Sequence, residues 1–260
     1  MKKIFLWTIL LIGLIQNSAV GQGPPITGDK PVMLGANTWL VKSLTEIRNT
    51  EGGTFAAAPL MVHYLPTANS LIGIHVPFVN TKFDGQESSQ SLGDIALLAK
   101  YQFYRKDGMG KTFRLVAKTL QTVPTGNQLN LEGISMGLYQ SYTGLIAGYE
   151  SLKYGISNEI GYSLQPAGNM DELRYKLSFG LPLMKPSYPV KKVNLYFEYQ
   201  SSWFVNMDEY LLLYAQGIQY AKGQFTIEAA IQFPLIQTSS EQRLETVSYT
   251  HLTLPTNREV

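Results

Sequence analysis

The most constraining feature of this chain is a period-two alternation of apolar and polar residues, in segments about as long as a tilted membrane-crossing strand. The clearest segment runs from Glu172 to Pro182, where one set of alternate positions is apolar and the other is polar, charged or glycine. A strand of this kind presents one face to lipid and the other to water. The same alternation recurs from Gln224 to Leu235. It predicts the strands of a transmembrane β-barrel.

Strands are expected at eleven places along the chain. They cover residues 32–46, 55–65, 70–80, 93–104, 111–122, 141–151, 154–164, 172–183, 190–203, 209–220 and 223–235. Bacterial single-chain barrels have an even number of strands, so this count requires one more strand to close the sheet. The predicted fold is therefore all-β, an antiparallel up-and-down transmembrane barrel of about 12 strands.

The end of the chain does not continue the alternation. Residues 247–260, VSYTHLTLPTNREV, include a stretch that resembles the translation of sequencing-adapter DNA. Pro255 and Asn257 would interrupt any strand there. We therefore expect residues 247–260 to be an irregular, adapter-derived tail and the closing strand to be missing from this sequence. The barrel domain is assigned to residues 32–246.

The first residues have the features of a secretory signal peptide. Lys2 and Lys3 form a basic start, residues 4–15 form an apolar run, and the small residues at 19–21 offer a cleavage site. The apolar run is too short for a membrane anchor, which takes roughly 20 residues. Residues 1–21 are therefore expected to be removed. Export of a barrel predicts the outer membrane of a Gram-negative bacterium.

The composition excludes some classes of protein. The chain has no cysteine, so strand pairing and burial must provide its stability. Its formal net charge is +2, which falls to zero without Lys2 and Lys3, and nothing indicates a nucleic-acid partner. No cofactor is expected. The expected partners are outer-membrane lipid and a small solute, and the sequence leaves the oligomeric state open.

Two stretches carry a resemblance to a known family, GDIALLAKYQFYR at residues 93–105 and TVPTGN at residues 122–127. They resemble the outer-membrane family associated with the meta-cleavage pathway of phenol degradation, distantly related to long-chain fatty-acid transporter barrels. In that family a Gly-Asp opens a strand ending in a Lys-Tyr-x-Phe-like sequence, and the strand after the hairpin ends in Pro-Thr-Gly. The resemblance covers residues 90–236. It implies an outer-membrane barrel that transports hydrophobic or aromatic compounds.

Charged residues in the polar phase of the strands are the expected lining of the lumen. They are Lys100, Arg114, Lys118, Glu159, Arg174, Lys176, Glu198 and Glu228. Two alternatives remain open: these charges pair across strands and fill a narrow barrel, or they line a selective polar path. About twelve strands enclose more space than eight but less than an open sixteen-stranded porin. Residues 22–31, rich in Gly and Pro, are either a plug for this space or a flexible periplasmic leader.

Two features could indicate other chemistry. Residues 133–137 match the G-x-S-x-G pattern of hydrolases, with Ser135 as the nucleophile, but a strand rather than a helix is expected to follow. His63 and His75 lie on adjacent expected strands and could hold a metal, yet no carboxylate or cysteine has ligand spacing, which favours two pore-facing or interface histidines.

The sequence thus predicts a passive channel for small, hydrophobic or aromatic solutes, with no catalytic activity. Two rivals remain. One is an outer-membrane hydrolase that uses Ser135, which would need a histidine within hydrogen-bond reach. The other is a secreted soluble β-sandwich or adhesin, in which the apolar faces would lie in a core between two sheets.

Overall fold

A computed structural model describes most of the chain. The described residues are 26–31, 33, 35–83, 85, 87–127, 136–167, 170–184, 191–222, 225–238 and 244–256. The signal peptide assigned to residues 1–21 and Ser135 lie outside them. Within the described part, no helix is long and apolar enough to cross a membrane.

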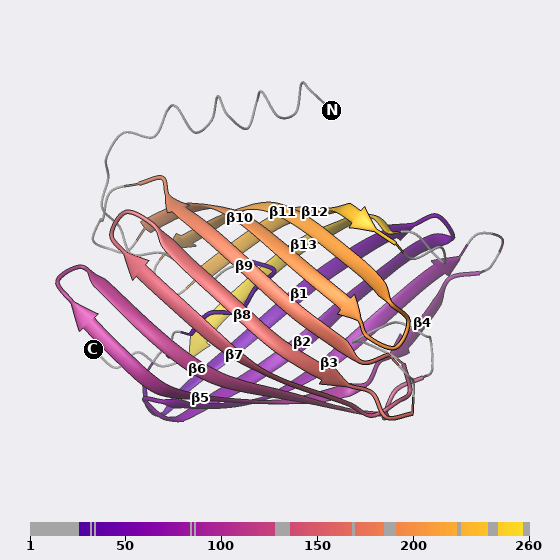
Figure 1. The fold of residues 1–260 in the computed structure, drawn as a ribbon, viewed down its shortest axis with the longest axis horizontal. Helices are drawn as coiled ribbons and strands as arrows, with labels where there is room; N and C mark the ends of the chain where they lie inside the picture. Colours follow the sequence, from indigo (N-terminus) through magenta and orange to yellow (C-terminus); the bar gives the residue numbers. More distant parts are fainter. Residues whose placement is uncertain are drawn as a thin grey trace.

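The described residues form thirteen strands, and every paired neighbour is antiparallel (Figure 1). They are β1 (Thr38–Thr50), β2 (Gly53–Thr67), β3 (Ser70–Phe83), β4 (Ser89–Leu92), β5 (Ile95–Gly108), β6 (Lys111–Val123), β7 (Gln140–Ser151), β8 (Gly155–Leu164), β9 (Glu172–Pro182), β10 (Lys191–Phe204), β11 (Glu209–Lys222), β12 (Phe225–Gln237) and β13 (Leu244–Thr256).

Twelve of these strands form a closed barrel. Each pairs with its neighbours along the chain, β1 also pairs with β13, and the β2–β3 pairing completes the ring. The short strand β4 is additional and pairs with the end of β3, at Phe78–Thr81. The predicted all-β up-and-down barrel of about 12 strands is confirmed.

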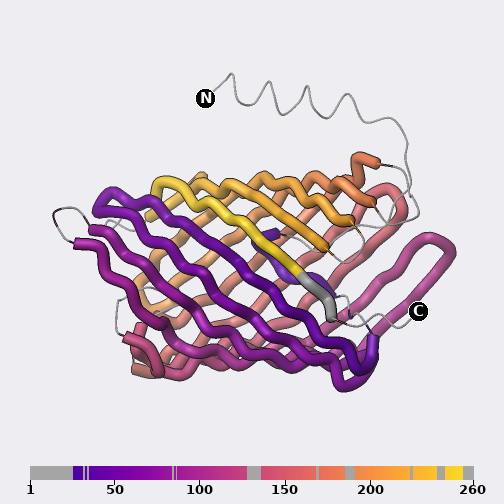
Figure 2. Tube along the Cα trace, turned by 180° about the vertical axis from the view of Figure 1, so that it is seen from behind, coloured from indigo at the N-terminus to yellow at the C-terminus, as the bar shows by residue number. Residues whose placement is uncertain are grey.

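The expectation of a missing closing strand is wrong. β13 runs beside β1, from the pair Thr50–Leu244 to the pair Trp39–Thr256 (Figure 2). On its other side it pairs with β12. The physical reason is that β1 and β12 would otherwise each present a row of unpaired N–H and C=O groups, which any extended segment can satisfy.

Pro255 does not prevent this pairing. It is in register with Leu40 of β1, but it lies beyond Thr253, the last residue of β13 that pairs with β12, so β12 requires no ladder hydrogen bond from it. The described residues 247–256 are therefore regular strand rather than the irregular tail that was expected. An origin of this stretch in adapter DNA stays a prediction.

All eleven strands expected from the sequence are present, with boundaries shifted by a few residues. The largest shift is at the start of the barrel, where β1 begins at Thr38 rather than at residue 32. Two strands were not expected from the sequence: β13, and β4, which with four residues is too short for a periodic pattern.

The two faces of the barrel differ as the alternation predicts. On β9, Leu173 and Tyr175 are 37% and 40% exposed on the outside, whereas Glu172 is 1% exposed on the inside. Other strongly exposed apolar residues on the strands include Ile72, Leu97, Tyr101, Leu145, Ile160, Ile218, Ile227, Ile231 and Leu252. A β-sandwich would bury such residues between two sheets, so the alternative of a soluble sandwich is wrong.

The links between strands distinguish the two ends of the barrel. Links of two or three residues at 68–69, 109–110, 152–154 and 223–224 share one end, called the turn end here, with the longer link 183–190. The opposite end, called the loop end, carries 84–94 with β4, 124–139, 165–171, 205–208 and 238–243, and the short link 51–52. In outer-membrane barrels, short turns face the periplasm and long loops face outward.

The motifs that carry the family resemblance meet at the loop end. The Asp94 carboxylate accepts hydrogen bonds from the backbone N–H groups of Thr125, Gly126 and Gly137 at 3.1, 3.0 and 2.8 Å. Gly126 approaches the backbone of Gly93 so closely that a Cβ there would lie 2.3 Å from a carbonyl carbon. These residues anchor the start and end of the 124–139 link to the beginning of β5.

The exposed apolar face leads to a test with Ile231→Arg, at the middle of β12. Arginine at the centre of a bilayer costs a barrel about 2–4 kcal/mol, and about 0–1 kcal/mol near the interface. Phe225→Arg, at the turn end of the same strand, is the matched control. Unfolding from lipid vesicles should show a larger loss of stability for Ile231→Arg. Equal losses would contradict a lipid-facing outer surface.

Candidate functional site

The candidate site is the lumen of the barrel. A cavity of about 390 Å³ in this lumen is lined by inward-facing residues from opposite walls. Asp94, Phe204 and Leu211 are among them, which places the cavity on the loop-end side. Apolar residues and charges of both signs share the lining.

Residues 26–31, called the plug here, cross this lumen before the chain enters β1 (Figure 2). On one wall, the N–H groups of Ile26 and Thr27 donate to the Glu198 carboxylate on β10 at 2.8 and 2.6 Å. On the same wall, Ser157 Oγ of β8, two strands from β10, donates to the carbonyl of Asp29 at 2.8 Å. Of the two alternatives for residues 22–31, the described part has the position of a plug rather than of a leader outside the barrel.

Two wall glycines make room for the plug. A Cβ on Gly217 of β11 would lie 2.4 Å from Ile26 Cδ1, and a Cβ on Gly148 of β7 would lie 2.4 Å from Pro31 Cγ. Both distances are shorter than real contacts of a Cβ, so a larger residue requires a shift: at Gly217 of the end of the Ile26 side chain and of Ala230 on β12, and at Gly148 of the Pro31 ring. The walls are therefore shaped to fit Ile26 and Pro31.

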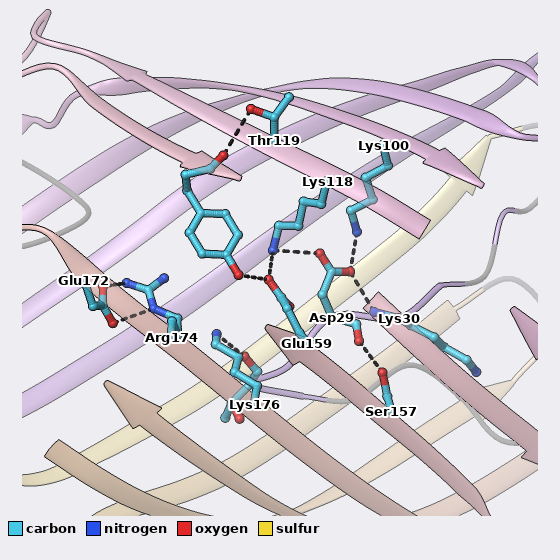
Figure 3. A network of polar contacts seen from close by, with 12 residues as sticks. Asp29, Lys30, Lys100, Lys118, Thr119, Ser157, Glu159, Glu172, Arg174 and Lys176 are labelled. Atoms are coloured by element: carbon cyan, nitrogen blue, oxygen red, sulfur yellow. Dashed lines mark hydrogen bonds and ion pairs between the residues drawn. The ribbon is translucent and has the colours of Figure 1, made fainter. Parts of the chain in front are cut away.

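Asp29 is the electrostatic centre of the plug (Figure 3). One oxygen of its carboxylate pairs with Lys100 of β5, and the other lies 3.1 Å from Lys118 Nζ of β6. Burial raises the pKa of this carboxyl, but the two lysines outweigh burial and hold the pKa well below its usual value. Asp29 is therefore ionised at neutral pH.

A second layer of polar contacts surrounds the ion pairs of Asp29. Lys118 also pairs with Glu159 of β8 at 2.8 Å, and Tyr142 OH donates to the same Glu159 oxygen at 2.6 Å. On β9, Arg174 Nε donates to Glu172 at 2.8 Å. These contacts are drawn together in Figure 3. They satisfy charges that would otherwise be costly to bury.

The eight residues expected to line the lumen all have inward-facing positions. Five of them line the cavity: Lys100, Lys118, Arg174, Lys176 and Glu228. Two lie behind it, Glu159 beneath Lys118 and Glu198 beneath the plug. Arg114 is set apart near the turn end, where it donates to Thr112 at 3.2 Å. The structure therefore brings seven of the eight together.

Asp29 and Lys42 were not expected among the charges of the lumen, and Glu172 was assigned to the polar face of its strand but not to the lining. Asp29 is the only acidic residue between positions 22 and 45, which was a usable signal. Lys42 lines the cavity from β1, where the apolar Leu44 faces inward with it and the polar Ser43 and Thr45 face outward, so the alternation does not reveal its phase. Glu172 has the polar phase of β9 and forms a nearly buried ion pair with Arg174.

The structure gives little support to a metal site or to a hydrolase. His63 and His75 contact each other through their Nε2 atoms at 2.9 Å and face the cavity. Among the described residues, no group of three or more His, Cys, Asp or Glu could hold a metal ion. The hydrolase alternative depends on Ser135, which lies outside those residues.

Comparisons with known proteins agree with the fold. No profile of a protein family matches the chain, and no curated protein matches it. Among solved structures it is similar to an outer membrane channel from Pseudomonas putida F1, with a TM-score of 0.64 and 10% identity over 89% of this chain and 100% of that one. The outer membrane protein OprD of Pseudomonas aeruginosa matches with a TM-score of 0.40 and 8% identity, over 92% and 98% of the two chains. The first likeness shows a shared barrel fold.

The glycine contacts predict how the plug can be displaced. Gly217→Val or Gly148→Val should cost about 1–3 kcal/mol of overpacking with the plug in place, which is roughly tenfold or more in its docking equilibrium. Because the chain has no cysteine, Thr27→Cys provides a single labelling site. A membrane-impermeant thiol reagent should label it faster in either valine variant.

Gly52→Val is the matched control for this experiment, because a Cβ at Gly52 would meet nothing within 4 Å. It should leave the labelling rate of Thr27→Cys unchanged. Equal labelling rates in all backgrounds would show that the two glycines do not accommodate the plug.

Proposed function

We propose that this protein is a passive channel in the outer membrane of a Gram-negative bacterium, and that small solutes pass through a lumen narrowed by the plug. The observation that carries the proposal is a closed barrel, apolar outside and polar inside, with a cavity of about 390 Å³ beside the plug. Closure satisfies the backbone groups that hydrocarbon cannot, which is what a membrane barrel requires.

The lumen suits a narrow path rather than an open pore. Its charges are largely paired with one another or with the plug, as for Lys118 with Asp29 and Glu159. A volume of about 390 Å³ is at the small end of the roughly 300–1,000 Å³ of small-molecule sites. The cavity therefore accommodates one small molecule at a time.

The proposed solute is hydrophobic or aromatic. Support comes from the family resemblance of residues 93–105 and 122–127, and from apolar stretches of the cavity wall. Met61, Leu98 and Leu120 contribute to that wall. These side chains can contact the body of such a solute while the charged residues hold water or its polar groups.

The proposal includes no catalysis. The solved structure of similar fold is a channel, and the described lumen residues form ion pairs and hydrogen bonds among themselves. No observation in the described part of the chain favours the hydrolase alternative over a channel.

Single-channel recording tests the proposal directly. The wild-type protein in planar bilayers should conduct weakly, because the plug occupies the lumen. Deletion of residues 22–31 should raise the conductance several-fold, since it removes the Asp29 and Glu198 contacts that hold the plug across the lumen. Heat-modifiable mobility should first show that both barrels are closed. The absence of conductance in both closed proteins would contradict a channel.

A further inference from the structure

Asp29 places a carboxylate where a small organic acid could bind. Its two oxygens are shared between two lysines from adjacent strands, Lys100 of β5 and Lys118 of β6 (Figure 3). Charge-assisted contacts of this kind are about twice as strong as neutral hydrogen bonds, and they recognise the carboxylate rather than the chain that carries it. The contact with Asp29 shows that the two lysines can bind a carboxylate.

We infer that Lys100, Lys118 and Lys42 form a binding site for the carboxylate of a small organic acid, and that Asp29 of the plug competes for this site. The inference rests on the proposed channel function and specifies its solute class. The plug then acts as an internal competitor, and a solute that binds the lysines releases Asp29 from them.

Lys42 is the part of this site that the plug leaves available. It lines the same cavity as Lys100 and Lys118, and no hydrogen bond or ion pair joins it to another described residue. Its charge acts on the carboxylates of Asp29 and Glu228, both of which line the same cavity. A solute anion that enters the cavity therefore meets one unpaired ammonium group before it displaces anything.

The balance of charge around Asp29 favours an anion. Four lysines, Lys42, Lys100, Lys118 and Lys176, face three carboxylates, those of Asp29, Glu159 and Glu228, while Glu46 and Glu172 pair with neighbouring arginines. If Asp29 leaves, Glu159 and Glu228 remain against the four lysines. A solute carboxylate in place of Asp29 restores the original balance, whereas a neutral or cationic solute does not.

The shape of the cavity indicates what the acid carries. Beside the lysines its wall includes Met61, Leu98 and Leu120, and the rigid side chains of Pro59 and Pro77. These apolar groups offer a surface for a flat or compact hydrocarbon body of a few rings or carbons. The site therefore suits a small aromatic acid better than a small polar one.

Displacement of Asp29 would loosen the plug without freeing it. The Ile26 and Thr27 contacts with Glu198 do not involve the lysines, and Ser157 binds the backbone of Asp29 rather than its carboxylate. The bound acid thus weakens the β5 and β6 side of the plug only. Passage of the solute is thereby coupled to movement of the plug on that side.

Three planar probes of similar shape and different charge test the inference: benzoate, benzamide and benzamidinium. Their dissociation constants would be measured by calorimetry on the closed barrel in detergent micelles. Wild type should bind benzoate at least about tenfold more tightly than the other two, as expected for one net charge-assisted contact. Lys42→Gln should remove most of this preference. Lys222→Gln, an exposed lysine at the turn end of β11, is the matched control and should change nothing.

Asp29→Asn separates competition from a purely structural role of the plug. It removes the competing charge but keeps the size of the side chain. Benzoate should then bind about tenfold more tightly, with benzamide unchanged. Equal gains for all three probes would mean that the variant only loosens the plug, and would overturn the inference. So would equal binding of benzoate and benzamide by the wild type.

The same preparations distinguish failure of this inference from failure of the channel function. Potassium chloride conductance is measured for each closed barrel. Conductance without a preference for benzoate overturns the carboxylate site and leaves the channel standing. A preference for benzoate without conductance, in wild type and in the protein that lacks residues 22–31, supports the site and contradicts the channel.

Discussion

The structure depends on one constraint: a backbone N–H or C=O group in hydrocarbon has no partner except another backbone group. The pairing of β13 with β1 is where this constraint is met, because it joins the two ends of the sheet. Closure of the sheet also creates the lumen. A flat sheet with the same alternating strands would have two faces but no interior in which the charged face could be enclosed.

The side chains on the inner face of the barrel impose a second requirement, because buried charges need partners. Side chains such as Glu159, Glu172 and Glu198 are at most 2% exposed, so each needs an opposite charge or a donor nearby. Cross-strand pairs supply some of these partners. The remainder come from the plug, whose backbone N–H groups bind Glu198 and whose Asp29 binds two lysines. The barrel and the plug therefore provide hydrogen-bond and ion-pair partners for each other's buried polar groups.

The same requirement connects stability with function. The contacts that neutralise the lumen also narrow it, so in the proposed channel a solute has to exchange for them. In the proposed site, a carboxylate makes that exchange with the smallest loss of charge-assisted contacts. The cavity beside Asp29, with its lysines and apolar wall, is the place where such an exchange is possible.

The sequence by itself determined the class of fold and the phase of its regular strands, such as β9 and β12, because a period of two assigns every residue of a strand to one of two faces. It placed Arg174 and Lys176 of β9 on the inner face without any knowledge of their neighbours. It did not show that β13 closes the barrel, since ladder hydrogen bonds come from the backbone and require little of the side chains. Only the tertiary structure decided which inner charges meet. Asp29 reaches Lys100 and Lys118, 71 and 89 residues away along the chain, because closure brings those strands around the plug, and no local pattern encodes such a contact.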